Sequence, residues 1–164
     1  MTHLRPYLNR DSPALARLWN RGATSSAVAR PLTVYEFDSQ VLGGPHFDPA
    51  GLIVAERENA VVGFVHAGFG PDHPPGRPLE LVHALGTVGM LVVDPQQNDA
   101  SLPARLFAAA EEYLRSRGAS VFYAGGQFPL NPYYWGVYGG SEWAGILSGD
   151  ATFRAVVEAA AIVR

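Results

Sequence analysis

Apolar residues near the start of the chain recur every three or four positions, the spacing of one buried helical face. After a weakly alternating stretch at 2–8 that predicts a strand, Asp11 or Ser12 is placed to cap a helix that Gly22 ends. A capping-box pattern, in which a hydroxyl and a carboxylate satisfy each other's backbone amides, predicts a second helix over 33–42. The buried stripe of the first helix would consist of Leu15, Leu18 and Trp19.

The period of the pattern then changes from a helical one to two, which is typical of strands. Two alternating stretches at 52–56 and 60–67, joined by a turn at 57–59, predict a β-hairpin. Four prolines within 71–80 predict a loop outside the sheet interior, because proline cannot donate to a ladder. A further apolar run at 88–93 predicts the third of three antiparallel strands.

The C-terminal part returns to helical spacing. Ser101 is placed to cap an amphipathic helix that runs to residue 117. A short apolar run at 119–124 predicts a strand buried on both faces, and 131–138 predicts a short helix. An alanine-rich stretch at 150–160 predicts the last helix. The apolar face of the helix after Ser101 would consist of Leu102, Leu106, Phe107, Ala110 and Leu114.

These elements predict one mixed α/β (α+β) domain over residues 1–164, built around a central, mostly antiparallel sheet with helices on its faces. The chain is long enough for a sizeable core. No internal repeat or linker divides it into two domains.

Composition narrows the chemistry, since all 12 basic residues are arginines and the chain has no lysine and no cysteine. Schiff-base lysines, phosphate-loop lysines, thiol nucleophiles, disulfides and thiolate-bound metals are therefore excluded. Any phosphate contact from a cationic side chain must come from arginine, whose planar fork binds phosphate oxygens in pairs.

Charge and hydropathy describe the partners that we expect. A formal net charge of −3 argues against nucleic-acid binding. No stretch approaches the ~20 apolar residues of a membrane span, and the first residues lack the apolar centre of a signal peptide, so we expect a cytoplasmic protein that does not bind membranes. The five histidines show no ligand spacing, which predicts no metal.

The stretch from 88 to 118 is the most informative one. A long apolar strand ends at Val93-Asp94-Pro95, a polar loop follows, and an amphipathic helix begins, whose exposed amides favour an anion. With this Val-x-Pro ending, the long helix after it and the order of elements over nearly the whole chain, the sequence resembles the GNAT superfamily of acyl-CoA-dependent N-acyltransferases. The resemblance implies a GNAT-like fold and acetyl-CoA as the co-substrate, without a metal.

The resemblance also implies where acetyl-CoA would bind. Its pantetheine arm would pair with the backbone of the strand, and its diphosphate would lie on the loop. The family's loop reads Arg or Gln, two residues, Gly, one residue, then Gly or Ala, and this chain has Asn98, Ser101 and Pro103 at those positions. Pro103 has no backbone N–H to offer a phosphate. The residues implied to bind the co-substrate are Met90, Leu91, Val92, Val93, Asn98, Asp99, Ala100, Ser101, Leu102, Ala104 and Arg105.

A second family pattern is an asparagine followed seven positions later by a tyrosine, here Asn131 and Tyr138. The Gly-aromatic pair that usually follows is Glu142-Trp143 in this chain. The resemblance implies that Tyr138 protonates the departing thiolate, and a phenol of pKa about 10 is protonated at neutral pH. The alternative interpretation is that Tyr138 belongs to an aromatic cluster of the core, together with Tyr133, Tyr134 and Trp135.

A general base is also needed, because the attacking amine must lose a proton. The apolar strand offers none, and the candidates nearest in sequence are Glu80 and His83, at the end of the proline-rich loop. His66, on the preceding strand, is either a further candidate or a hydrogen-bonded residue of the sheet.

The resemblance implies transfer of an acyl group to a primary amine, on a small molecule or a peptide, by direct attack without a covalent enzyme intermediate. The alternative is a catalytically degenerate GNAT-fold domain that acts as an acyl-CoA-binding, regulatory or protein-interaction module. The sheet hairpin that usually closes the family's C-terminus is expected to be short or missing after residue 142. A homodimer, or a second GNAT-like domain as in tandem members of the family, would then cover the open sheet edge.

Overall fold

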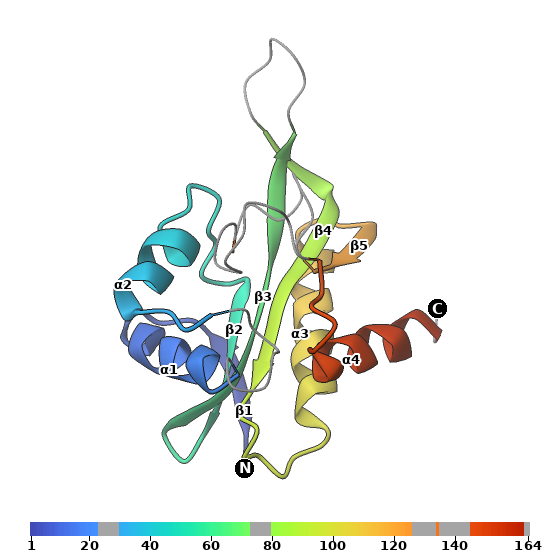
Figure 1. The fold of residues 1–164 in the computed structure, drawn as a ribbon. Coiled ribbons are helices and arrows are strands. Elements are labelled where there is room, and N and C mark those ends of the chain that lie inside the picture. Colours follow the sequence, from blue (N-terminus) through green and yellow to red (C-terminus); the bar gives the residue numbers. More distant parts are fainter. Residues whose placement is uncertain (23–29, 73–79, 126–133, 135–144, 163–164) are drawn as a thin grey trace.

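A five-stranded sheet forms the centre of the computed structural model, which describes residues 1–22, 30–72, 80–125, 134 and 145–162 of the chain (Figure 1). The strands follow one another in sequence order, the first four antiparallel and the fifth parallel to the fourth. This is the mixed, mostly antiparallel sheet predicted from the sequence. The strands are β1 (His3–Pro6), β2 (Leu52–Arg57), β3 (Ala60–Asp72), β4 (Glu80–Val93) and β5 (Val121–Ala124).

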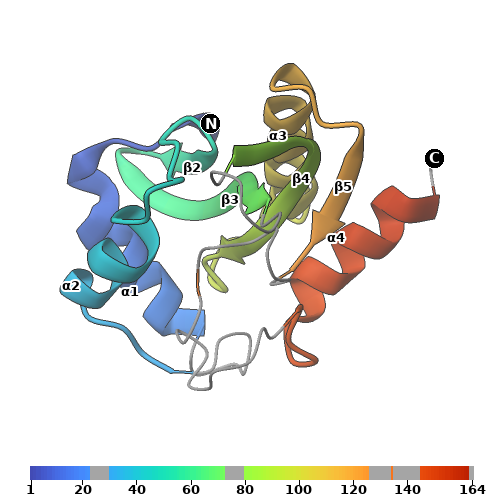
Figure 2. The same cartoon turned by 90° about the horizontal axis from the view of Figure 1, so that it is seen from above.

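Helices cover both faces of the sheet (Figures 1 and 2). On one face lie α1 (Ser12–Gly22), which a 3₁₀ turn η1 (Asn9–Asp11) precedes, and α2 (Val34–Phe37), which the π-helical turn η3 (Asp38–Leu42) continues. On the other face lies α3 (Leu102–Ser116), with α4 (Ala151–Ile162) packed beside it. None of the described helices combines the length and apolar character that a bilayer crossing requires.

Each face of the sheet has its own core, because successive side chains of a strand point to opposite faces. Phe64 on β3 packs with Trp19 and Phe37 under α1 and α2, and its neighbour Val65 packs with Leu106 under α3. Both cores are fully buried at these positions, so the stripes predicted for the two long helices are confirmed.

The β3–β4 hairpin is longer than the sequence predicted and projects beyond the helices (Figure 1). Pro71 pairs with Leu81 and Asp72 with Glu80, so the prediction of a loop over the whole of 71–80 is wrong at its two ends. The ladder accommodates proline here because its register shifts between Phe69 and Pro71, and irregular positions do not require the N–H that proline lacks.

Two further local predictions are wrong. Ser101 precedes α3 but its side chain makes no capping hydrogen bond, because its hydroxyl is bonded to Asp99 instead. β5 is not buried on both faces, since Val121 is 44% exposed at the outer end of a short strand. The helix predicted over 131–138 lies outside the described residues except for Tyr134, whose φ of 62° is not that of a right-handed helix.

Candidate active site

The middle of β4 contains a bulge at which the strand separates from β5. His66 pairs with Met90 and Ala67 with Val88, which leaves Gly89 as an extra residue on β4. β5 pairs with β4 only from Leu85 to Val88, and the last pairing there is followed by a hydrogen bond of 2.8 Å from the Gly125 amide to the Val88 carbonyl. Beyond the bulge, β4 has no strand partner on the β5 side among the described residues.

The backbone of this unpartnered stretch presents hydrogen-bonding groups to the β5 side. The Asp94 amide donates to the Val62 carbonyl at 2.9 Å, so the backbone N–H and C=O groups of Asp94 point toward β3. Because the polar groups of successive residues alternate between the two sides, those of Leu91 and Val93 point toward β5. An extended ligand could pair with these two residues as an added strand would. Met90, Leu91 and Val92 are buried, and Val93 is half-buried.

The loop between β4 and α3 uses its own carboxylates to satisfy its amides. Asp94 Oδ1 accepts from the Gln96 amide at 3.0 Å. Asp99 Oδ1 accepts from the Ser101 amide at 3.0 Å and from the Ser101 hydroxyl at 2.6 Å. The Asp99 carbonyl accepts from the Leu102 amide at 3.1 Å. The side-chain hydrogen bond from Ser101 contributes most to holding the pKa of Asp99 below its usual value, so an ionised carboxylate lies at the start of α3.

Arg105 also has internal partners. Its guanidinium donates to the Thr2 carbonyl at 2.8 Å and to Asp99 at 3.4 Å. Three of the residues that the sequence assigned to co-substrate binding, Asn98, Asp99 and Arg105, do line one cavity of about 710 Å³ together with Thr2. Ala100, Ser101 and Ala104 are exposed beside them, and Leu102 is buried under the helix.

The structure does not bring Glu80 and His83 close to the unpartnered stretch of β4. Both are exposed near the top of the β3–β4 hairpin, and the His83 ring contacts that of Phe69 with a centroid distance of 4.8 Å. Glu80 precedes Gly89 by nine positions, which is about 30 Å along an extended strand. Tyr138 lies outside the described residues. The roles assigned to these three residues stay predictions.

On the α1 side of the bulge, a buried pair joins the sheet to the segment before Tyr138. His66 Nδ1 and the Tyr134 hydroxyl are 2.9 Å apart, and the Tyr134 ring stacks on Trp19 with a centroid distance of 5.8 Å. Burial lowers the pKa of His66 to about 3, so its imidazole is neutral at neutral pH. This geometry favours the interpretation of His66 as a hydrogen-bonded residue of the sheet, because a group of such low pKa is a weak base.

Thr87 is a polar residue of the site that the sequence reasoning missed. It is fully buried two positions before Gly89, and its hydroxyl has no hydrogen-bond partner within the described part of the chain. A threonine in a strand is ordinary in sequence, so no pattern distinguished it. An unpaired buried hydroxyl costs about 1–3 kcal/mol, and such a group next to a strand separation can donate to a bound molecule.

The described residues contain no cluster of three or more histidine or acidic side chains that could hold a metal ion. The features that the structure does bring together are a β4 edge with outward-pointing backbone groups, a buried hydroxyl beside the bulge, and a loop at the start of α3. These features suit an extended, neutral ligand segment along β4.

Comparison with known proteins places this geometry in context. A sequence model of the acetyltransferase (GNAT) family matches residues 14–139, well over half of the chain. A mycothiol acetyltransferase of Thermobispora bispora is 39% identical over 79 residues, which cover 45% of this chain and 23% of that protein. A mycothiol acetyltransferase of Cellulomonas flavigena is 34% identical over 87 residues, which cover 51% and 24%. The chain therefore matches less than a quarter of the length of either relative.

Solved structures have the same fold. A GNAT family acetyltransferase from Brucella melitensis in complex with acetyl-CoA superimposes with a TM-score of 0.58 over 82% of this chain and 79% of that one. The two sequences are 17% identical, so the likeness concerns the fold.

Proposed function

The chain belongs to the acetyltransferase (GNAT) family, and from that premise we propose that it transfers an acyl group, acetyl in the first instance, from acyl-CoA to a primary amine. The observation that carries the proposal is the bulge at Gly89 with the separation of β4 from β5 beyond it. The outward-pointing backbone groups of Leu91 and Val93 are suited to the amides of a pantetheine arm. The names of the two mycothiol acetyltransferases support acetyl as the acyl group.

In the proposed reaction, the lone pair of the amine attacks the thioester carbonyl carbon, the carbon–sulfur bond breaks, and an amide forms. A backbone amide of β4 near the bulge would stabilise the negative charge that develops on the carbonyl oxygen. Tyr138 would donate its phenolic proton to the departing thiolate, and the proton lost by the amine would pass to solvent or to a base. We propose that the Thr87 hydroxyl orients the reacting groups from the α1 side of the bulge.

The backbone of β4 is better suited to bind acyl-CoA than the β4–α3 loop is. Arg105 and the amides of Ser101 and Leu102 have internal partners, and Asp99 places a negative charge where a diphosphate would lie. The β4 backbone would therefore contribute more to binding than the loop does.

The same loop supports a second candidate function, that of a catalytically degenerate GNAT-fold domain that binds acyl-CoA weakly or serves as a regulatory or interaction module. Asp99 at the start of α3 is the observation that favours it. The acceptor amine, a homodimer and a second GNAT-like domain covering the sheet edge remain proposals in either case, because the chain matches only part of its relatives.

Calorimetry with acetyl-CoA and with desulfo-CoA tests the binding step, and measurable binding of both is expected. The absence of binding would contradict the acyltransferase and any role in acyl-CoA binding, and would leave only the regulatory or interaction module. Transfer can be followed with a thiol reagent, since the chain has no cysteine to give a background signal. With a panel of primary amines, wild type should release CoA, and Tyr138→Phe should turn over about a hundredfold more slowly if the phenol is the acid.

Thr87→Val separates catalysis from stability at the same site. Removing an unpaired buried hydroxyl should leave the free energy of unfolding unchanged or raise it, because valine has nearly the same shape. Turnover should fall. An unchanged rate would show that Thr87 has no part in the reaction.

A further inference from the structure

The N-terminal part of the chain carries most of its unbalanced positive charge. Residues 1–30 contain five arginines against a single aspartate, a net charge of +4 in a chain whose total is −3. Arg17 and Arg21 lie one turn apart on α1, and Arg10 lies in the 3₁₀ turn η1 that precedes this helix. We call these three arginines the stripe. Arg10 and Arg17 are exposed, whereas Leu15 and Trp19 of α1 are buried in the core.

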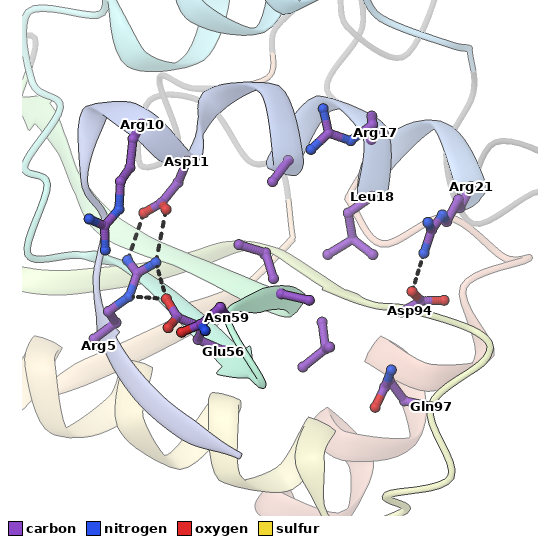
Figure 3. Close-up of a pocket in the computed structure, with 14 residues that line it drawn as sticks. Arg5, Arg10, Asp11, Arg17, Leu18, Arg21, Glu56, Asn59, Asp94 and Gln97 are labelled. Atoms are coloured by element: carbon purple, nitrogen blue, oxygen red, sulfur yellow. Dashed lines mark hydrogen bonds and ion pairs between the residues drawn. The ribbon is translucent and has the colours of Figure 1, made fainter. Parts of the chain in front are cut away.

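This stripe lines a cavity of about 680 Å³, which we call the α1 groove. Its other walls are the β2–β3 turn and the loop that follows β4 (Figure 3). The volume falls within the range of about 300–1,000 Å³ that is typical of small-molecule sites. The α1 groove lies on the α1 face and on the β2–β3 side of the sheet, whereas the acyl-CoA site proposed above lies on the β5 side of β4.

The acidic side chains of the groove wall all have arginine partners (Figure 3). Arg5 donates to both oxygens of Asp11, at 2.7 and 2.8 Å, and to Glu56 at 2.6 Å. Arg21 forms an ion pair with Asp94 at the other end of the groove. The hydrogen bond with Asp11 is the main cause that holds the pKa of Arg5 above its usual value.

Arg10 and Arg17 are the remaining cations of the wall. Both are exposed, and neither forms an ion pair with any residue that the structure describes. The four arginines of the wall outnumber its three acids, so the cavity has a net positive charge that attracts an anion. The planar forks of the two guanidinium groups without an ion pair match the oxygens of a phosphate.

The β2–β3 turn adds uncharged hydrogen-bonding groups. Glu58 and Asn59 have φ of 52° and 62°, which is the two-residue turn that matches the twist of a hairpin. This conformation costs energy for residues other than glycine, and it presents the Asn59 side chain to the groove. Gln97, which accepts from Arg57 at 3.5 Å, supplies a second amide. Leu18, Val61 and Val62 provide an apolar floor.

From this arrangement we infer that the α1 groove is a binding site for a small molecule that carries a phosphate or diphosphate group. Arg10 and Arg17 bind the phosphate oxygens, and the amides of Asn59 and Gln97 bind hydroxyl or carbonyl groups of the remainder. Two sources offer this chemistry, the phosphates of CoA itself and a separate phosphorylated ligand.

Inorganic pyrophosphate is the probe, and calorimetry on the whole chain is the measurement. Wild type is expected to bind it, and the double variant Arg10→Gln/Arg17→Gln is expected to bind about a hundredfold more weakly, at about tenfold for each charged hydrogen-bonding group removed. Arg115→Gln/Arg154→Gln is the matched control, because it removes the same charge from two exposed arginines that pair within their own helices. The control should bind within about twofold of wild type, as distant surface charges are screened.

Thermal unfolding of the three proteins checks that the substitutions leave the fold intact, which exposed side chains should. Absence of pyrophosphate binding in wild type, equal binding in the Arg10/Arg17 variant, or an equal loss in the control would each overturn the inference. A second titration in saturating CoA identifies the source and supports the inference in both of its outcomes. Competition assigns the groove to the phosphates of CoA, and simultaneous binding assigns it to a separate ligand.

Discussion

The β4–α3 loop and the α1 groove lie at the same end of the sheet, and each combines arginines with carboxylates in a different way. In the loop, the donors are engaged, because Asp99 accepts from Ser101 and Arg105 donates to the Thr2 carbonyl. In the groove, the acceptors are engaged, because Arg5 holds Asp11 and Glu56. Internal pairing, more than the number of arginines, therefore decides where a chain can receive an anion.

The two regions share the residue at which β4 ends. Asp94 accepts from the Gln96 amide at the start of the loop and forms an ion pair with Arg21 in the groove wall. Its carboxylate is buried, and a buried charge is costly unless it has a hydrogen-bond donor and an oppositely charged partner. A chain without lysine has only arginine for this purpose, and two of the four wall arginines form ion pairs with the three acids of the groove.

Arg5→Met gives the largest expected effect. It leaves Asp11, whose side chain is 4% exposed, without its bidentate partner, and breaking such a buried pair costs about 3 kcal/mol or more in the free energy of unfolding. Urea denaturation measures this loss. Arg115→Met, which breaks a 3.5 Å pair within α3 whose arginine is 54% exposed, should lose less than about 1 kcal/mol.

The same variant tests whether pairing of the acids with Arg5 matters for binding in the groove. With Arg5 absent, Asp11 and Glu56 would attract Arg10, and pyrophosphate binding in the groove should weaken. Unchanged pyrophosphate binding in a folded Arg5→Met protein would mean that neutralisation of the acids does not matter for the groove.

The burial of His66 predicts a pH dependence of the free energy of unfolding that does not involve the β4–α3 loop or the α1 groove. Its pKa is about 3 in the folded protein because of burial, and about 6.5 in the unfolded chain. Its contribution to stability is therefore fully present above the unfolded pKa and decreases as the pH falls from about 6.5 toward 3. The expected slope is roughly 1.4 kcal/mol per pH unit in that window.

Urea denaturation between the two pKa values measures this slope. His66→Gln, which retains a hydrogen-bonding group for Tyr134, should lose most of it, and His83→Gln should keep it because His83 is exposed on the hairpin. Equal slopes in wild type and His66→Gln would contradict a buried neutral imidazole.

Asp99→Ala would leave donors of the β4–α3 loop available for an anion, as arginines of the α1 groove are. It frees the Ser101 amide and removes a negative charge at the start of α3, so CoA should bind about three- to tenfold more tightly. Asp99→Asn, which keeps an acceptor but loses the charge, should give an intermediate affinity. Pyrophosphate binding in the groove should not change, and calorimetry measures both. A weaker or unchanged affinity for CoA would show that Asp99 does not compete with the diphosphate.

Arg105→Gln gives the smallest expected effect. Because its guanidinium is bonded to the Thr2 carbonyl and to Asp99, its removal should change the affinity for CoA by less than about twofold. A loss of tenfold or more would mean that Arg105 leaves these partners and binds phosphate, as the family resemblance implied.

The sequence predicted the regular part of the molecule well, because the determinants are local. The capping box at Thr33 and Glu36, the stripe of α3 and the order of strands are confirmed, and so is membership of the GNAT family. The length of the β3–β4 hairpin was not predicted, because the pairing of Pro71 with Leu81 depends on a register shift that no local pattern shows.

The sites were harder to predict, because their determinants join distant residues. Asp99 was assigned to phosphate binding as one member of a loop, and only its bond with Ser101 shows that it satisfies the loop internally. The groove depends on contacts between Arg5 and Glu56, which are 51 positions apart. The role of Tyr138 stays a prediction, since it lies outside the described residues.

The most direct test of the central claim is an NMR titration of the ¹⁵N-labelled protein with pyrophosphate, with the backbone amides assigned. The largest shifts are expected at Arg10, Arg17 and Asn59, with small shifts at Ser101 and Leu102. Shifts confined to the stretch from Ser101 to Arg105, with none along α1, would contradict it.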